Sequence, residues 1–471
     1  MKFATSPIIQ RYQWLILWLG IVLLAVYGLS RAGWLHLPGA QTPSLLQRLR
    51  VPKPSDPWEI NAIIDGYVVK LALPQDLNKI NLLPPLIQSG VRQRIKYRQR
   101  NIDFLHDTAQ DLDQILNTGQ SVQVAEHDQT LERVVMSLPS NFQGAFPEWP
   151  LSLHEPLLTA LPSYTKVDFF LPTDLIPQVA LRLQLLGMAQ RVTLRGEQEY
   201  EIMEEKLPLP HFTTPWVRDL FWAVAKQGHR SLLLLPMAFS QINDLSRPDN
   251  DYVEEMEDVQ HKVVRVPLFF KGGNLQIGVV GGRRVLFIGE KELQQNELAF
   301  YNAFFYSPPR EEVLGLFKQL AGADEVRVLP NSKHLFHLDM MMSVLSSGTV
   351  ALIEPVDKDA LGEDDQRVIA QARQALTAYG FRVVGVPTLA DWVNTFKSPV
   401  NILPFKHRDT GRLSAIVPQF EYREVAANGT PESMEWKIRQ AYKDAGVATF
   451  FARSSFSQLR GDFHCAVVPI M

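Results

Sequence analysis

Four short stretches of the sequence carry residue types that catalysis uses, and they lie far apart along the chain. These stretches are Trp216-Val-Arg218-Asp219, Lys271-Gly-Gly273-Asn274, His337-Leu-Asp339 and Gly461-Asp-Phe-His464-Cys465. A thiolate is a nucleophile, a histidine can transfer protons, and carboxylates can hold a planar cation through paired hydrogen bonds. Cys465 is the single cysteine among 471 residues, so an intrachain disulfide is excluded.

Each stretch taken alone also has a structural interpretation. An adjacent Arg218 and Asp219 are typical of a surface ion pair, and a Gly-Gly-Asn sequence is typical of a tight turn. A lone cysteine is most often a small buried hydrophobic residue. His337 and Asp339 would lie on one face of a strand, and two polar side chains in an apolar run need a buried partner or a cavity.

The elements that must position these stretches alternate between strand and helix. From residue 131 onward the pattern predicts about five units of mixed strands and helices, and each polar stretch falls where a unit would turn. Repeats longer than about 50 residues with this mixture are typical of a closed ring of supersecondary units. The sequence therefore predicts an α/β fold over residues 131–471.

The order of the four stretches resembles that of the guanidino-group-modifying enzymes, the pentein superfamily. W-x-R-D, G-G-N, H-x-D and a C-terminal G-x-x-H-C follow one another, and the agmatine deiminase and bacterial-type peptidylarginine deiminase branch is the most similar. The resemblance covers residues 131–471. It implies a five-bladed α/β propeller of ββαβ units, which agrees with the units expected from the pattern.

The resemblance also implies a role for each matching residue. Cys465 is the expected nucleophile, which forms a thiouronium intermediate, and His337 is the expected general acid and base. Asp219 and Asp339 are expected to hold the guanidinium. The residues expected to bind the substrate around them are Trp216, Arg218, Gly273, Asn274 and Arg460. No metal and no other cofactor is implied.

Two positions depart from the family pattern. Many relatives carry a glutamate before the Gly-Gly pair, where this sequence has Lys271, and relatives often show Gly-Pro where Leu220 and Phe221 follow Asp219. A lysine ~4 Å from a guanidinium would repel it by roughly 1–4 kcal/mol, depending on the local dielectric. Three interpretations of Lys271 stay open: it points away, it binds an anion on the substrate, or the site is degenerate and non-catalytic.

The N-terminal part predicts a membrane anchor. Residues 12–30 carry no charge, and a helix of that length would rise ~28 Å, close to the ~30 Å of a hydrocarbon core. We therefore expect a tail over 1–11, a transmembrane helix over 12–33, a Pro-rich linker over 34–58 and a small accessory region over 59–130. A cleaved signal peptide is the competing interpretation. The flanking charges nearly balance and do not determine the orientation. The short leading tail resembles an export signal, which favours an extracytoplasmic catalytic domain.

The sequence thus predicts a single-pass membrane hydrolase that deiminates agmatine, arginine or peptidyl-arginine. An amidinotransferase would use the same residues, and a non-catalytic binding protein is a further alternative. A metal site is a second chemical hypothesis, with donors from the set His334, His337, Asp339, His464 and Cys465. The net charge of −3 argues against a nucleic-acid partner, and the oligomeric state is not predicted.

Overall fold

The computed structural model describes most of the chain beyond its first 50 residues. The described residues are 51, 53, 56–64, 67–118, 121–122, 125–138, 151–196, 215–226, 231–237, 253, 256–257, 261–304, 308–420 and 433–470. Residues 49–471 form one compact unit, and residues 1–48 form another that lies outside the described residues. The predicted tail and the predicted transmembrane helix over 12–33 therefore lie outside them too. Among the helices that are described, none is long and apolar enough to cross a membrane.

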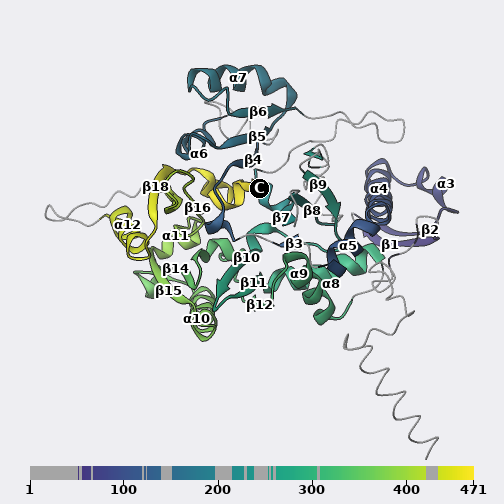
Figure 1. Ribbon diagram of the computed structural model, residues 1–471. Coiled ribbons are helices and arrows are strands. Elements are labelled where there is room, and N and C mark those ends of the chain that lie inside the picture. The colour runs from purple at the N-terminus through teal and green to yellow at the C-terminus, as the bar shows by residue number, and fades with distance from the viewer. Residues whose placement is uncertain are drawn as a thin grey trace, which may run out of the picture. The chain divides into compact units, whose positions relative to one another are not determined.

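The described strands fall into six hydrogen-bonded sheets (Figure 1). The strands are β1 (Trp58–Ile64), β2 (Tyr67–Leu73), β3 (Ser121–Val122), β4 (Arg133–Ser137), β5 (Lys166–Phe170), β6 (Val192–Arg195), β7 (Trp222–Lys226), β8 (Ser231–Leu235), β9 (His261–Arg265), β10 (Leu275–Val280), β11 (Arg283–Gly289), β12 (Glu325–Leu329), β13 (Met342–Ser346), β14 (Thr349–Pro355), β15 (Arg382–Thr388), β16 (Leu403–Lys406), β17 (Leu413–Gln419), β18 (Ala448–Arg453) and β19 (Val468–Ile470). The helices are α3 (Leu77–Ile80), α4 (Pro85–Asp107), α5 (Ala109–Thr118), α6 (Glu155–Ala160), α7 (Ile176–Leu185), α8 (Glu290–Phe304), α9 (Arg310–Ala321), α10 (Glu363–Ala378), α11 (Ala390–Asn394), α12 (Met434–Asp444) and α13 (Phe463–Ala466).

Five of these sheets share one pattern, in which an antiparallel pair is followed by a parallel strand. The pattern is plainest in β10-β11-β12, β13-β14-β15 and β16-β17-β18, and in each the parallel strand follows at least one helix. A parallel neighbour requires such a crossover. The sheets β19-β4-β5-β6 and β3-β7-β8-β9 extend the pattern by one strand each. A closed five-bladed propeller stays a prediction.

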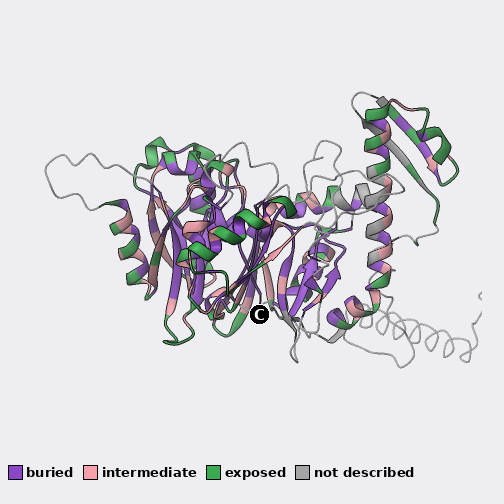
Figure 2. Ribbon diagram, turned by 90° about the horizontal axis from the view of Figure 1, so that it is seen from above, coloured by how far each residue is buried: buried purple, intermediate pink, exposed green. Residues whose placement is uncertain are grey.

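The sequence explains why these elements form. Every residue of β8 is buried, and its run of four leucines is typical of a strand covered on both faces. In α10, the buried residues Val368, Ala372 and Leu376 recur at helical spacing, and three acidic residues in its first turn favour the helix N-terminus. Figure 2 shows the result, with buried residues along the strands and exposed residues on the outer faces of the helices.

The chain between 58 and 128 combines a small module with a segment that joins the sheets. β1 and β2 form an antiparallel pair, and apolar side chains of β2 pack with those of α3 and α4 in a cluster of their own. After α5, β3 pairs with β7, and a 3₁₀ turn over Glu126–Asp128 follows. The end of the predicted accessory region therefore contacts the part of the chain that the resemblance covers.

The C-terminal strand closes one of the sheets. β19 pairs with β4 in antiparallel register, so that Val468 lies opposite Val135. Phe463, Ala466 and Val467, which precede β19, belong to a buried cluster with residues of β4 and β5. This pairing fixes α13, the helix that carries the cysteine.

Candidate active site

Cys465 lies in the short helix α13. Asp462 begins this helix, because its Oδ1 accepts a hydrogen bond from the backbone N–H of Phe463 at 3.1 Å and another from Ser454 Oγ at 2.6 Å. Asp462 is fully buried, and burial raises its pKa well above the usual value. The cap therefore holds Cys465 in a buried position.

The Cys465 thiol lies between a carboxylate and an amide. Its Sγ donates to Asp339 Oδ2 at 3.2 Å, and Asn401 Nδ2 donates to the sulfur at 3.2 Å. Asn401 Oδ1 also accepts from the backbone N–H of His464 at 2.8 Å. Burial and the charges of Asp339 and Asp219 raise the pKa of Cys465 well above its usual value, so the thiol keeps its proton in this arrangement.

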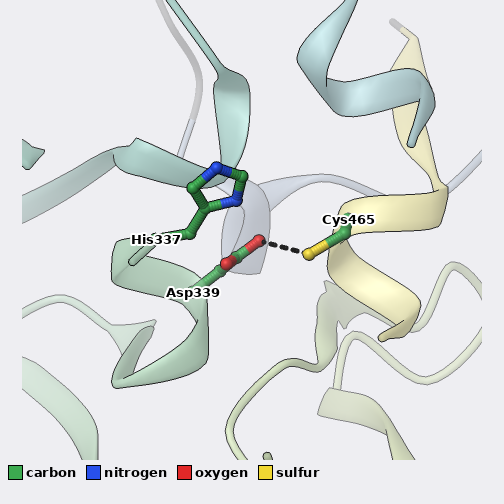
Figure 3. A group of neighbouring side chains, drawn as sticks. All are labelled: His337, Asp339 and Cys465. Atoms are coloured by element: carbon green, nitrogen blue, oxygen red, sulfur yellow. Dashed lines mark hydrogen bonds between the residues drawn. The ribbon is translucent and has the colours of Figure 1, made fainter. Parts of the chain in front are cut away.

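His337 and Asp339 lie together, although they are not in the predicted strand. The segment is a bend followed by a single 3₁₀ turn over Leu338–Met340, and β13 begins only at Met342. The donor atoms of His337, Asp339 and Cys465 all lie within 4.8 Å of one another. Figure 3 shows the His337 ring and the Cys465 sulfur facing the Asp339 carboxylate from two sides.

A buried network of charges continues from Asp339 away from the thiol. His464 Nδ1 lies 2.9 Å from Asp339 Oδ2, and His464 Nε2 lies 3.0 Å from Glu126 Oε2. Arg218 pairs with Glu126 and donates from Nε to the backbone carbonyl of His464 at 2.6 Å. The network thus connects the thiol to the 3₁₀ turn at Glu126.

The charges in this network determine the pKa values of its members. Burial and Arg218 oppose protonation of His464, but Glu126 and Asp339 outweigh them and raise its pKa. Burial opposes ionisation of Asp339, but its hydrogen bond with His464 and the charges of His464 and His337 lower its pKa. Arg218 and His464 likewise overcome burial and lower the pKa of Glu126. The network therefore favours an ionised Asp339 beside a protonated His464.

Two carboxylate oxygens beside the thiol have no hydrogen-bond partner in the described part of the chain. They are Oδ1 of Asp339 and Oδ1 of Asp219, and both atoms are buried. An unpartnered buried acceptor is costly, and such acceptors in a native protein call for an explanation. A flat cation with several N–H groups would provide the missing hydrogen bonds and the opposite charge.

A cavity of about 560 Å³ opens at this point. Its volume is in the range typical of small-molecule sites. Its lining residues are Trp216, Asp219, Lys271, Lys333, His334, Phe336, His337, Asn394, Phe396, Leu459, Arg460 and Cys465. Five of the predicted site residues are in this set: Trp216, Asp219, His337, Arg460 and Cys465.

Arg218 and Asn274, both predicted to bind substrate, instead contact the protein itself and do not line the cavity. The contacts of Arg218 are those of the charge network. Asn274 is buried; its Nδ2 donates to Glu292 Oε1 at 2.8 Å, and its Oδ1 accepts from the backbone N–H of Leu338 at 3.0 Å. Asn274 therefore holds the turn that carries Asp339. Burial raises the pKa of Glu292 to about 7.

The two glycines before Asn274 allow a close approach of three segments. A Cβ atom on Gly273 would lie 2.8 Å from both Asp339 Oδ2 and His337 Nδ1. A Cβ atom on Gly272 would collide with the backbone and side chain of Arg218. The Gly-Gly pair is thus required by packing against the site, as well as by the turn.

Sequence reasoning missed three residues that organise the site: Asn401, Glu126 and Glu292. Asn401 stands two residues before β16, and a polar residue ahead of an apolar run was the available signal. Glu126 lies before the region that the resemblance covers, and Glu292 lies in α8, which carries no recognisable motif. Nothing in their local sequence distinguishes them from surface acids.

The donors considered for a metal separate into two groups. His337, Asp339 and Cys465 gather around one point, as described above. His334 lies 2.9 Å from Asp365 instead, and both ring nitrogens of His464 are engaged by Asp339 and Glu126. The three gathered donors offer one nitrogen, one oxygen and one sulfur, a set that Zn²⁺ accepts once the thiol is deprotonated.

Comparison with proteins of known structure shows which fold the chain shares. No family model and no curated protein matches the sequence. An agmatine deiminase from C. jejuni matches with a TM-score of 0.52 at 14% identity, covering 74% of this chain and 96% of that one. An agmatine deiminase from Enterococcus faecalis matches with a TM-score of 0.50 at 12% identity, covering 75% of this chain and 96% of that one. A protein provisionally assigned as a peptidyl-arginine deiminase matches with a TM-score of 0.52 at 14% identity, covering 74% of this chain and 98% of that one.

These likenesses confirm the predicted fold in its coarser form. The chain has the mixed α/β, pentein-like fold of agmatine deiminases over about three quarters of its length. At 12–14% identity they say nothing further about its reaction. The reaction has to be argued from the site.

Proposed function

We propose that this protein hydrolyses a C–N bond of a guanidino compound through a covalent intermediate on Cys465. The observation that carries the proposal is the pair of buried, unpartnered carboxylate oxygens on Asp339 and Asp219 beside a buried thiol. A guanidinium bound there would donate N–H groups to both oxygens. Its carbon would then lie next to the sulfur, as the attack requires. The fold of the agmatine deiminases supports the same function.

Substrate binding would prepare the nucleophile. The bound cation offsets the negative charges of Asp339 and Asp219, which are two causes of the high pKa of Cys465. The thiol pKa therefore falls when the guanidinium arrives, and His337 takes the proton. Asn401 Nδ2, already directed at the sulfur, donates to the thiolate. The thiol thus stays protonated until there is a substrate to attack.

The first half of the reaction forms a thiouronium. The Cys465 sulfur attacks the guanidinium carbon, and the resulting tetrahedral adduct collapses as one C–N bond breaks. His337 returns its proton to the departing nitrogen, so that ammonia leaves. The carboxylates of Asp339 and Asp219 hold the remaining cation in place.

The second half restores the enzyme. His337, now neutral, removes a proton from water, which attacks the thiouronium carbon. The C–S bond breaks, and the ureido product and the Cys465 thiolate separate. The sum is guanidinium plus water giving a ureido compound plus ammonium.

The proposal is tested on the purified chain with agmatine, arginine and an arginine peptide. We expect ammonia and the ureido product in equal amounts, and acid quenching should trap the substrate on Cys465 by mass spectrometry. Cys465→Ala should abolish both signals, while its thermal unfolding shows that it folds. Turnover that survives Cys465→Ala would contradict the covalent mechanism. No turnover and no adduct with any guanidino substrate would favour the binding-protein alternative.

The acceptor is tested in the same assay. A transfer to an amine uses the same residues and gives a new guanidino compound instead of ammonia. Adding amines and analysing products distinguishes the amidinotransferase alternative, because water should remain the acceptor if our proposal is right. A yield of ammonia that falls as a new guanidino product rises would favour transfer.

A metal-dependent hydrolase is a second candidate, favoured by the gathering of His337, Asp339 and Cys465 donor atoms within 4.8 Å. A Zn²⁺ ion there would supply a Lewis acid and an activated water. Elemental analysis of the purified protein distinguishes this candidate from the first. Stoichiometric metal together with activity lost to a chelator supports it, and full activity of metal-free protein rejects it.

We also propose that residues 12–33 anchor the protein in a membrane, on the strength of the uncharged run over 12–30. The full chain should stay with the membrane fraction through alkaline extraction. A chain that lacks residues 1–33 should not. Release of the full chain by the same treatment would reject the anchor.

A further inference from the structure

Three cationic side chains line the same cavity as the carboxylate and the thiol. They are Lys271, Lys333 and Arg460, and among the described lining residues Asp219 is the only acid. If the guanidinium occupies Asp219 and Asp339, no lining acid is left to balance the three cations. Once the guanidinium is bound, the described lining of the cavity is therefore left with an excess of positive charge.

None of these three cations has a salt bridge to a carboxylate in the described part of the chain. Glu292 offsets the charge of Lys271 only in part. Lys271 acts to lower the pKa of Glu292, but burial outweighs this effect and the pKa stays raised. Lys291 adds to the positive charge, because Lys271 acts on it as a like charge. Unpaired cations at a cavity wall attract anions.

The position of Arg460 is fixed by its backbone and by an aromatic ring. Its φ of 68° lies in the left-handed region, which is uncommon outside glycine and costs on the order of 1 kcal/mol. Its guanidinium lies 5.5 Å from the ring centre of Phe396, which also lines the cavity. A strained backbone and a stacked side chain hold a positive charge at the cavity.

The nucleophile lies at the buried end of the site and two of the cations at its exposed end. Cys465 and Asp339 are buried, Asp219 and Lys271 are half-buried, and Lys333 and Arg460 are exposed. A substrate would therefore enter with its guanidinium towards the buried carboxylates and its other end among the cations. The order of charges along the cavity then prescribes the order of charges along the substrate.

We infer that the substrate is a guanidino compound whose far end carries an anionic group, such as an ω-guanidino carboxylate. This inference rests on the proposed function and deepens it. Agmatine ends in an ammonium group, which Lys271, Lys333 and Arg460 would repel. A carboxylate at the same distance from the guanidinium would be attracted by all three. Lys271, which departs from the family pattern, thus becomes a determinant of specificity.

The inference is tested with two compounds of equal chain length. Agmatine and 5-guanidinopentanoate share the guanidinium and four methylene groups and differ only in the charged end. We expect kcat/KM to favour the carboxylate by about 100-fold at low salt, because the two end groups differ by two charges opposite three cations. The preference should shrink as salt is added.

Charge changes at the wall should alter the preference. Lys271→Gln should lower the ratio about tenfold, and Lys271→Glu about 100-fold, so that agmatine is then used as well as the acid. Lys318→Gln serves as the matched control, because Lys318 is exposed on α9 and does not line the cavity. A ratio that is the same in Lys271→Glu and in Lys318→Gln would overturn the inference.

Binding to Cys465→Ala separates this inference from the proposed reaction. If this variant binds 5-guanidinopentanoate more tightly than agmatine by calorimetry, the inference holds even when the wild type turns over neither compound. If the wild type uses agmatine as well as the acid or better, the inference fails while the proposed reaction stands. Equal or tighter binding of agmatine to the variant would likewise overturn the inference.

Discussion

The buried end and the exposed end of the cavity treat charge in opposite ways. At the buried end two ion pairs form within the protein: Asp339 with His464, and Glu126 with Arg218. At the exposed end, Lys333 and the other two cations have none among the described residues. The paired charges fix geometry and protonation, and the free Oδ1 atoms of Asp339 and Asp219 remain for the guanidinium. The unpaired cations remain available to a ligand.

Two aspartates beside the nucleophile show that burial alone does not determine charge. Asp339 and Asp462 are both fully buried. Burial raises the pKa of Asp462, which has only a hydroxyl and one N–H as partners. The imidazole of His464 lowers the pKa of Asp339. The carboxylate that accepts from the thiol is thus the one kept ionised, and the other serves as a helix cap.

The largest effect on the contrast between the buried end and the exposed end is expected from Asp339→Asn. The change keeps the shape of the side chain but removes the charge that holds the guanidinium and partners His464. We expect kcat/KM to fall by roughly 10²–10³ for every substrate, measured by ammonia release. Loss on one substrate only would assign Asp339 to specificity, and the comparison would fail.

Gly273→Ala should cost about 100-fold in kcat. The added Cβ would lie 2.8 Å from Asp339 Oδ2 and His337 Nδ1, so both must move, and a shift of about 1 Å can cost this much. Gly315→Ala is the matched control, because a Cβ there meets nothing within 4 Å. A Gly273→Ala enzyme as active as the control would show that Asp339 and His337 do not need this spacing.

Glu126→Gln should lower activity about tenfold and the free energy of unfolding by roughly 3 kcal/mol, because Arg218 stays buried without its partner charge. His464 binds its proton more tightly in the native state, so its contribution to stability is full at low pH and is lost as pH rises through the native pKa.

In Glu126→Gln this loss with rising pH should become smaller, and the His464 pKa measured by NMR should fall. Asp128→Asn, in the same 3₁₀ turn but exposed, is the control and should change neither. An unchanged His464 pKa in Glu126→Gln would leave Glu126 with a purely structural role.

The smallest effect is expected at the exposed end. Lys333→Gln should raise KM for 5-guanidinopentanoate about fivefold, because one attraction is lost, and should change kcat less than KM. Steady-state kinetics on the acid and on agmatine measure both constants. A fall in kcat comparable with that of Asp339→Asn would show that the two ends do not act separately.

The local pattern of apolar residues is enough to explain strands and helices whose own spacing matches the element they form. The leucine run of β8 and the apolar spacing of α10 are examples. It failed at His337 and Asp339, where the expected strand is a turn. That turn is held by Asn274, whose Oδ1 binds Leu338 from 64 residues away. A hydrogen bond of that span leaves no trace in the local sequence.

The candidate site shows the same limit. The order of the polar stretches was enough to point to Cys465, His337, Asp339 and Asp219. Asn401 and Glu126 could not be predicted, because they reach the site over 64 and 338 residues of chain. Whether a polar residue lines a cavity or holds a loop depends on such distant contacts. The local sequence does not show them, so Arg218 and Asn274 were wrongly predicted to line the cavity.

The span of the buried network makes the site a sensor of complete folding. Glu126 and His464 meet across 338 residues, so no partly folded chain has an assembled network. Loop closure of that length is reached late. Since Cys465 is the only cysteine of the chain and lines the cavity, its reaction with a small thiol reagent reports whether the folded site admits a small molecule, with no other thiol interfering. The nucleophile is thus also an intrinsic probe of an assembled and accessible site.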